Sequence, residues 1–164
     1  AASSLHIAYE DGNDRDARRD MALASTMSGM ALANAGLGAV HGLAAVIGGM
    51  FPASPHGAVC AALLPRVILA NWRAARNHGA VELLGRFKET AAILTGDSHC
   101  AVEDAVDWLG SLCADLAIPG LSRYGVAADH INAIVEQARK ASSMKANPVE
   151  LTAAELAGIV NAAL

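Results

Sequence analysis

The sequence is poor in aromatic side chains, and a long stretch of it carries no charge. Tryptophan, tyrosine and phenylalanine occur twice each among 164 residues, so a core must be built from alanine, leucine, valine, isoleucine and methionine. No Asp, Glu, Lys or Arg lies between Met21 and Pro65. No convincing strand alternation or internal repeat is present, whereas helical periodicity runs almost throughout. We therefore predict an all-α, multi-helix fold.

Composition also argues against several functional classes. The 16 acidic residues outnumber the 12 lysines and arginines, and no basic patch is evident, which disfavours nucleic-acid binding. Cys60, Cys100 and Cys113 are odd in number and lack metal-knuckle spacing. We interpret them as buried, reduced thiols of a cytoplasmic protein. No signal peptide is recognisable.

The uncharged stretch raises the alternative of a membrane-associated helical hairpin. A spanning helix needs about 20 mostly apolar residues. Here serine, asparagine, histidine and proline interrupt the run, and glycines divide the rest into short pieces. A pair of core helices is the better interpretation, and we expect no membrane partner.

Caps and breakers predict where the helices lie. The expected ranges are 3–10, 14–34, 37–47, a helix from Pro55 that Pro65 kinks or divides before Asn71, then 80–94, 98–116 and 128–141, and a last helix opened by a Thr152–Glu155 capping box. We expect Met21, Met27 and Met30, at helical spacing, to face the core. Trp72 and Trp108 are predicted packing anchors, and His6, His78, His99 and His130 are predicted to face solvent or cap helices.

His41 and His56 are the two histidines of the uncharged stretch. A separation of 15 positions excludes one helix face, but a helix–loop–helix turn can bring the two side chains together. Neutral imidazole is a ligand for Fe, Zn, Ni or Cu. Two ligands are too few for a closed site, and hydrogen-bonded core histidines explain the pattern as well.

A longer pattern surrounds these histidines. It comprises Asn34-Ala35-Gly36-Leu37-Gly38-Ala39-Val40-His41, then Gly48-Gly49, Pro55-His56-Gly57, Leu63-Leu64-Pro65 and Asn71. Most of the chain, on this pattern, resembles the C-terminal helical domain of the iron-containing (group III) alcohol dehydrogenases, the dehydroquinate synthase-like α-domain.

The resemblance implies a metal site and a dinucleotide. In this family one Asp and three His hold a divalent metal, and His41 and His56 match the last two histidines. Iron is the first expectation and zinc the second. Asn34, Gly36 and Gly38 would lie near NAD or NADP, although a helix cap and a tight turn explain them equally well.

The resemblance also implies what this chain lacks. Residues 1–164 would form a single helical metal-binding domain, and the N-terminal nucleotide-binding domain would be absent from this chain. The intact parent would interconvert small-molecule alcohols with aldehydes or ketones, and the resemblance implies a homodimer. We expect the piece alone to be inactive and to bind metal weakly.

Two departures and two alternatives stay open. Ala45 occupies a position where the family often has a histidine, which puts the usual proton relay in doubt. The loop before His56 is one residue longer than is common. A maleylacetate reductase-like oxidoreductase domain is one alternative function. A non-catalytic helical interaction module, with both histidines hydrogen-bonded in the core, is the other.

Overall fold

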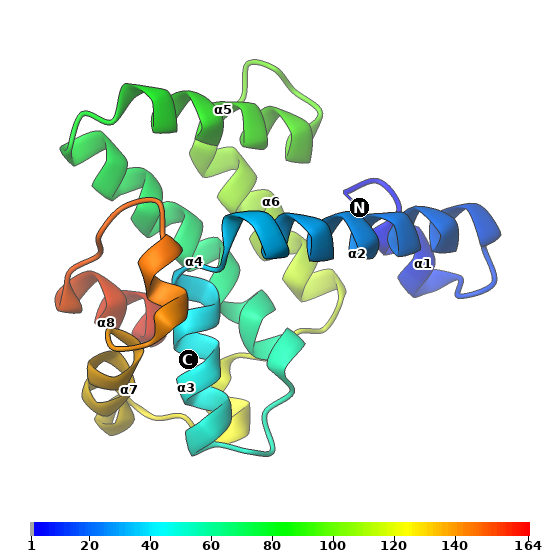
Figure 1. The fold of residues 1–164 in the computed structure, drawn as a ribbon. Coiled ribbons are helices and arrows are strands. Elements are labelled where there is room, and N and C mark those ends of the chain that lie inside the picture. The colour runs from blue at the N-terminus through cyan, green and yellow to red at the C-terminus, as the bar shows by residue number, and fades with distance from the viewer. Residues whose placement is uncertain (1) are drawn as a thin grey trace. The chain divides into compact units, whose positions relative to one another are not determined.

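The computed structural model describes residues 2–164, and every regular element within them is a helix (Figure 1). The predicted all-α fold is therefore confirmed. Contacts between residues divide the chain into two compact units, Ala1–Gly36 and Leu37–Leu164. The boundary falls in the glycine-rich turn that precedes His41.

The first unit is a helical hairpin of α1 (Leu5–Glu10) and α2 (Arg15–Ala35). The Asp14 carboxylate accepts hydrogen bonds from the Asp16 and Ala17 backbone N–H groups at 3.0 and 2.9 Å, which caps α2 as an N-terminal Asp should. Ser4 Oγ donates to the Asp20 carboxylate at 2.9 Å and joins the two helices. Gly36, at φ +75°, ends α2.

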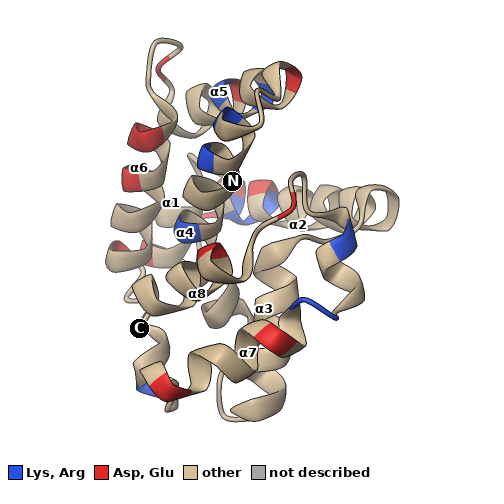
Figure 2. Ribbon diagram, turned by 90° about the vertical axis from the view of Figure 1, so that its left-hand side faces the viewer, with Lys and Arg blue, Asp and Glu red and all other residues tan. Residues whose placement is uncertain are grey.

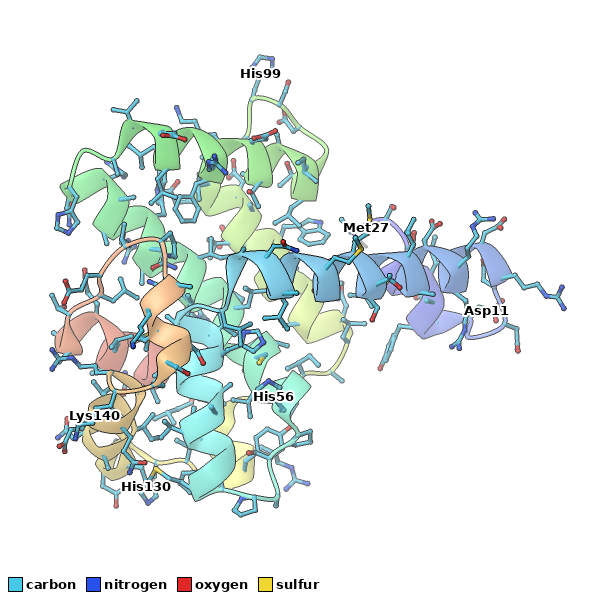
Figure 3. The ribbon with its side chains drawn as sticks, in the orientation of Figure 1. Asp11, Met27, His56, His99, His130 and Lys140 are labelled. Carbon is cyan, nitrogen blue, oxygen red and sulfur yellow. The ribbon has the colours of Figure 1, made fainter. Side chains whose placement is uncertain are left out.

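The expected burial of the methionines on α2 is wrong for two of them. Met27 is 61% exposed and Met30 is 65% exposed, and Leu23 lies on the same stripe. Met27 projects from α2 in Figure 3. Because α1 has only six residues, nothing within this unit can cover the C-terminal half of the 21-residue α2. Helical periodicity identifies an apolar stripe but cannot say what covers it.

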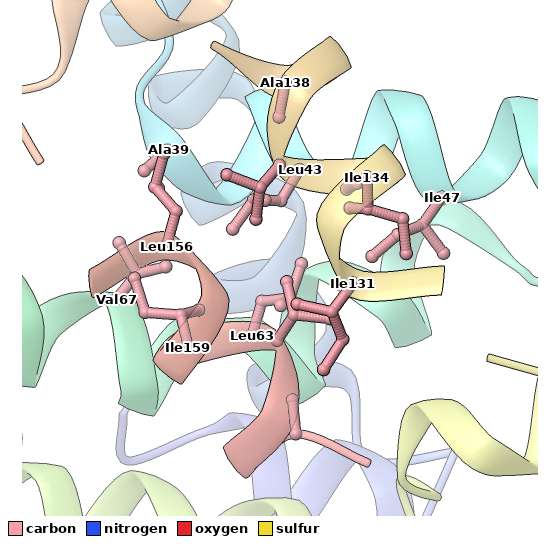
Figure 4. Close-up of a cluster of buried hydrophobic side chains, with 14 of the residues drawn as sticks. Ala39, Leu43, Ile47, Leu63, Val67, Ile131, Ile134, Ala138, Leu156 and Ile159 are labelled. Atoms are coloured by element: carbon pink, nitrogen blue, oxygen red, sulfur yellow. The ribbon is translucent and has the colours of Figure 1, made fainter. Parts of the chain in front are cut away.

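The second unit contains six α-helices and three short 3-10 helices. These are α3 (Ala39–Met50), α4 (His56–Asn77), α5 (Val81–Thr95), α6 (Val102–Asp115), η1 (Leu121–Tyr124), η2 (Ala128–His130), α7 (Ile131–Ala138), η3 (Ser142–Ala146) and α8 (Ala153–Ala162). The main core joins α3, α4, α7 and α8 (Figure 4). Its largest fully buried side chains include Leu43, Ile47, Leu63, Ile134 and Leu156.

A smaller apolar cluster joins α4, α5 and α6. Trp72 is buried there against Phe87, as predicted for a packing anchor. Its indole N–H donates to a Glu103 carboxylate oxygen at 3.1 Å. Bonds from the Glu103 backbone N–H and from this indole, with a smaller contribution from Arg76, lower the pKa of Glu103. The first turn of α6 carries Glu103 and Asp104, and Figure 2 shows acidic residues along this helix.

Of the two expected effects of Pro65, a kink or a division of its helix, the division does not occur: α4 continues from His56 to Asn77. Proline has no N–H for the carbonyl four residues earlier, which is that of Ala61. The Cys113 thiol on α6 donates to this carbonyl, with Sγ 3.5 Å from the oxygen. A distant side chain thus replaces the missing bond, and burial of Pro65 in the helix packing holds the helix together.

The start of α6 differs from the expected one. α6 begins at Val102 rather than at 98, because the Asp104 carboxylate accepts the Ala101 N–H at 2.8 Å and fixes the helix start there.

α4 alone among the helices of residues 2–164 is by itself long and apolar enough for a membrane span, and 44% of that segment is buried. Its two sides contribute to both apolar clusters, as a core helix does.

Candidate metal centre

His41 lies in the first turn of α3, whose start is fixed by a residue far along the chain. No local side chain caps this helix. Instead Asn147 Oδ1 accepts the Ala39 backbone N–H at 3.0 Å, 108 positions away in sequence. Asn147 also donates to Asn71 Oδ1 and to the Val149 carbonyl, both at 2.7 Å. Asn71 Nδ2 returns a bond to Asn147 Oδ1 at 3.3 Å.

His56 is the first residue of α4. Pro55 precedes it in extended conformation, and Ser54, which is buried, closes the connecting loop by donating its hydroxyl to the Phe51 carbonyl at 2.7 Å. Figure 3 labels His56 at this helix start. The loop brings the rings of His41 and His56 to a centroid separation of 5.5 Å, with the ring planes at 47°.

A third donor, Cys60, completes the cluster. It follows His56 by one helical turn, and its Sγ lies 3.5 Å from His56 Nε2. One ligating atom from each of His41, His56 and Cys60 lies within 4.8 Å of the other two. His56 is exposed, whereas His41 and Cys60 are half-buried. The cluster therefore lies at the edge of the unit and opens to solvent.

The electrostatics of the cluster favour uncharged donors. Burial, and then repulsion by His56, lower the pKa of His41. Burial raises the pKa of the Cys60 thiol. His41 is therefore more readily neutral than a free histidine, and neutral imidazole is the form that binds a metal. No charged side chain occurs on α3 (Figure 2).

The three predicted cofactor-binding positions lie at or beside the helix ends that flank the unit boundary. Asn34 is exposed on α2, and its amide donates to the Met30 carbonyl at 2.7 Å. Gly36 supplies the positive φ that ends α2. Gly38 begins α3, where an added Cβ would lie 2.9 Å from Asn147 Oδ1. Each position thus has a local structural reason for its residue type.

Several important residues escaped sequence reasoning. Cys60 was interpreted as a structural thiol because it lacks Cys-x-x-Cys spacing, yet its i, i+4 relation to His56 on a helix was a usable signal. Asn147 and Asn71 gave no local signal, because their bonds join segments 76 positions apart. Ala45, one turn after His41, is exposed on α3. His130 caps η2 as expected, its Nδ1 accepting the Ala127 N–H at 3.0 Å.

Within residues 2–164 the fold is all-helical, and two imidazoles and a thiol that could hold a metal ion lie near two adjoining helix starts. Residues 1–164 match the C-terminal model of the Fe-containing alcohol dehydrogenase family. The chain belongs to this family.

Two relatives align with nearly the whole of this chain. Alcohol dehydrogenase 4 of Saccharomyces cerevisiae is 35% identical over 161 residues, which is 98% of this chain and 40% of the relative. Choline dehydrogenase of Bacillus subtilis is 31% identical over 92% of this chain and 37% of the relative. The chain spans about two-fifths of the length of these relatives.

Solved structures share the fold. A crystal structure of a 1,3-propanediol oxidoreductase matches with a TM-score of 0.86 and 31% identity, over 99% of this chain and 42% of that one. An alcohol dehydrogenase from Oenococcus oeni matches with a TM-score of 0.85 and 30% identity over the same shares.

Proposed function

We propose that this chain is the helical, metal-holding part of an NAD(P)-dependent alcohol dehydrogenase that interconverts alcohols with aldehydes or ketones. The observation that carries the proposal is the convergence of His41 and His56 in a chain of this family. The named relatives are dehydrogenases of alcohols, which favours this function over the maleylacetate reductase alternative.

The donor set fits a divalent transition metal. Imidazole nitrogen suits iron and zinc, and the pKa shift of His41 favours the neutral ring. His41 and His56 would hold the cation from two helix starts. The remaining family ligands, an Asp and a His, would come from a helix that precedes this segment in the complete protein, and an N-terminal domain would supply the NAD(P)-binding fold. When bound, the metal supplies Lewis acidity toward the alcohol or carbonyl oxygen, and NAD(P) supplies or accepts hydride.

This chain's own residues would orient that chemistry. Asn147 fixes the first turn of α3 and hence the backbone that carries His41. The Phe51–Ser54 bond fixes the loop that delivers His56. Asn34, Gly36 and Gly38 are proposed to lie beside the dinucleotide, because glycine lets the backbone approach a ligand closely and the Asn34 side chain is exposed. Ala45 cannot transfer a proton, so another group must do so.

The test uses the complete protein that carries this chain. Metal analysis should find one iron or zinc per subunit, and primary alcohols should be oxidised with NAD or NADP. His41→Ala and His56→Ala should each lose metal and activity, whereas His78→Ala, at the exposed end of α4, should retain both. Full metal content and turnover in both site variants would refute the proposal.

A further inference from the structure

Cys60 stands where a third metal ligand would stand. In a tetrahedral zinc site with Zn–S near 2.3 Å and Zn–N near 2.0–2.1 Å, the nitrogen and sulfur atoms are about 3.6 Å apart. The observed distance from Cys60 Sγ to His56 Nε2 is 3.5 Å. His41 offers a nitrogen within 4.8 Å of both atoms. One cation can therefore reach all three donors with small side-chain movements.

The geometry points to a cation site of two histidines and one cysteine within this chain, selective for thiophilic divalent metals such as Zn²⁺ and Co²⁺. The inference deepens the proposed function, because it rests on His41 and His56 as ligands. It also revises the expectation of weak binding, which counted two donors. A thiolate favours zinc and cobalt over Mg²⁺ and Ca²⁺, which prefer oxygen.

The arrangement fits a working site rather than a closed structural one. Three protein ligands and an open fourth position are typical of catalytic zinc. His56 is exposed, so the open side of the site faces solvent or the parts of the complete protein that would supply the Asp and the further His. All five donors together would require a five-coordinate metal, which catalytic zinc can adopt. When the cation binds, the Cys60 thiol releases its proton to water and the sulfur lone pair coordinates the metal. The rival interpretation is an S–H···N hydrogen bond between Cys60 and His56 without any metal role.

Cobalt titration of the 164-residue chain separates these interpretations. The wild type should develop a near-ultraviolet sulfur-to-cobalt charge-transfer band at one equivalent. Cys60→Ser should lose this band and bind Co²⁺ at least tenfold more weakly, since loss of even an outer partner of a ligand costs about 10–100-fold. Cys100→Ser, in the loop before α6, is the matched control and should retain both. Far-ultraviolet circular dichroism verifies that each variant is folded.

The outcomes also separate this inference from the proposed function. Cobalt binding that needs His41 and His56, without a charge-transfer band and with equal affinity in Cys60→Ser, would refute the role of Cys60 and leave the two-histidine proposal standing. Binding unaffected by His41→Ala and His56→Ala would refute both. In a second measurement, Zn²⁺ should slow the alkylation of Cys60 by iodoacetamide, and the alkylation rate of Cys100 in the same sample serves as the reference. Equal Cys60 alkylation rates with and without Zn²⁺ would contradict the inference.

Discussion

Replacing Asn147 tests whether a distant amide holds the helix that carries His41. Asn147→Ala removes four hydrogen bonds: one from Ala39, two exchanged with Asn71, and one to Val149. At about 1 kcal/mol each, the loss of unfolding free energy should be about 4 kcal/mol. Ala39 and Asn71 are both buried, so water cannot readily replace the lost partner.

Asn147→Asp is the milder variant. It keeps an acceptor for the Ala39 N–H but loses both donated bonds, which should cost about 2 kcal/mol. A negative charge at the N-terminus of α3 should recover up to about 1 kcal/mol of this. Asp should therefore be clearly more stable than Ala at this position, and it should preserve the Co²⁺ affinity that depends on His41.

Urea unfolding followed by tryptophan fluorescence is the appropriate assay, because both tryptophans, Trp72 and Trp108, belong to the second unit. A double-mutant cycle with Asn71→Ala should show coupling of at least about 1 kcal/mol. Asn132→Ala, an exposed amide on α7, is the control and should change stability by less than about 0.5 kcal/mol. A cost below about 1 kcal/mol for Asn147→Ala, or strict additivity with Asn71→Ala, would refute the reasoning.

Three further outcomes are expected. Gly38→Ala should destabilise by about 1–3 kcal/mol through its clash with Asn147, and urea unfolding should show most of this cost disappear in an Asn147→Ala background. Glu103→Gln should lower the unfolding free energy by about 1 kcal/mol near neutral pH. Because folding lowers the pKa of Glu103, the stabilisation by its carboxylate is present above the unfolded pKa and is lost as pH falls through the folded pKa. The unfolding free energies of wild type and Glu103→Gln should therefore converge in acid. Met27→Ser should leave the unfolding free energy within about 0.5 kcal/mol, since Met27 is exposed; a loss of several kcal/mol would show that Met27 is buried in solution.

Local signals predicted the helices well, and non-local bonds explain what was missed. Asp14 and the Thr152–Glu155 capping box act within a few residues, so both helix starts were recoverable from sequence. The continuity of α4 through Pro65 could not be predicted locally, because the Cys113 thiol that satisfies the freed carbonyl comes from another helix. The exposure of Met27 was missed because periodicity does not reveal the covering partner. The closeness of His41 to His56 needed only a helix–loop–helix turn and was anticipated.

The placement of His41 and His56 gives a physical reason for an anionic ligand beside them. Both lie in the first turn of a helix, where the unpaired N–H groups carry about half a positive charge. A dication between two neutral imidazoles keeps its full +2 charge there, and the helix starts oppose it. A thiolate from Cys60 would reduce the charge of the assembly to +1, as a carboxylate from the rest of the complete protein would, and both together would reduce it to zero. Because Cys60 supplies its share of this compensation from within the chain, we expect the 164-residue chain to bind a thiophilic cation without the carboxylate.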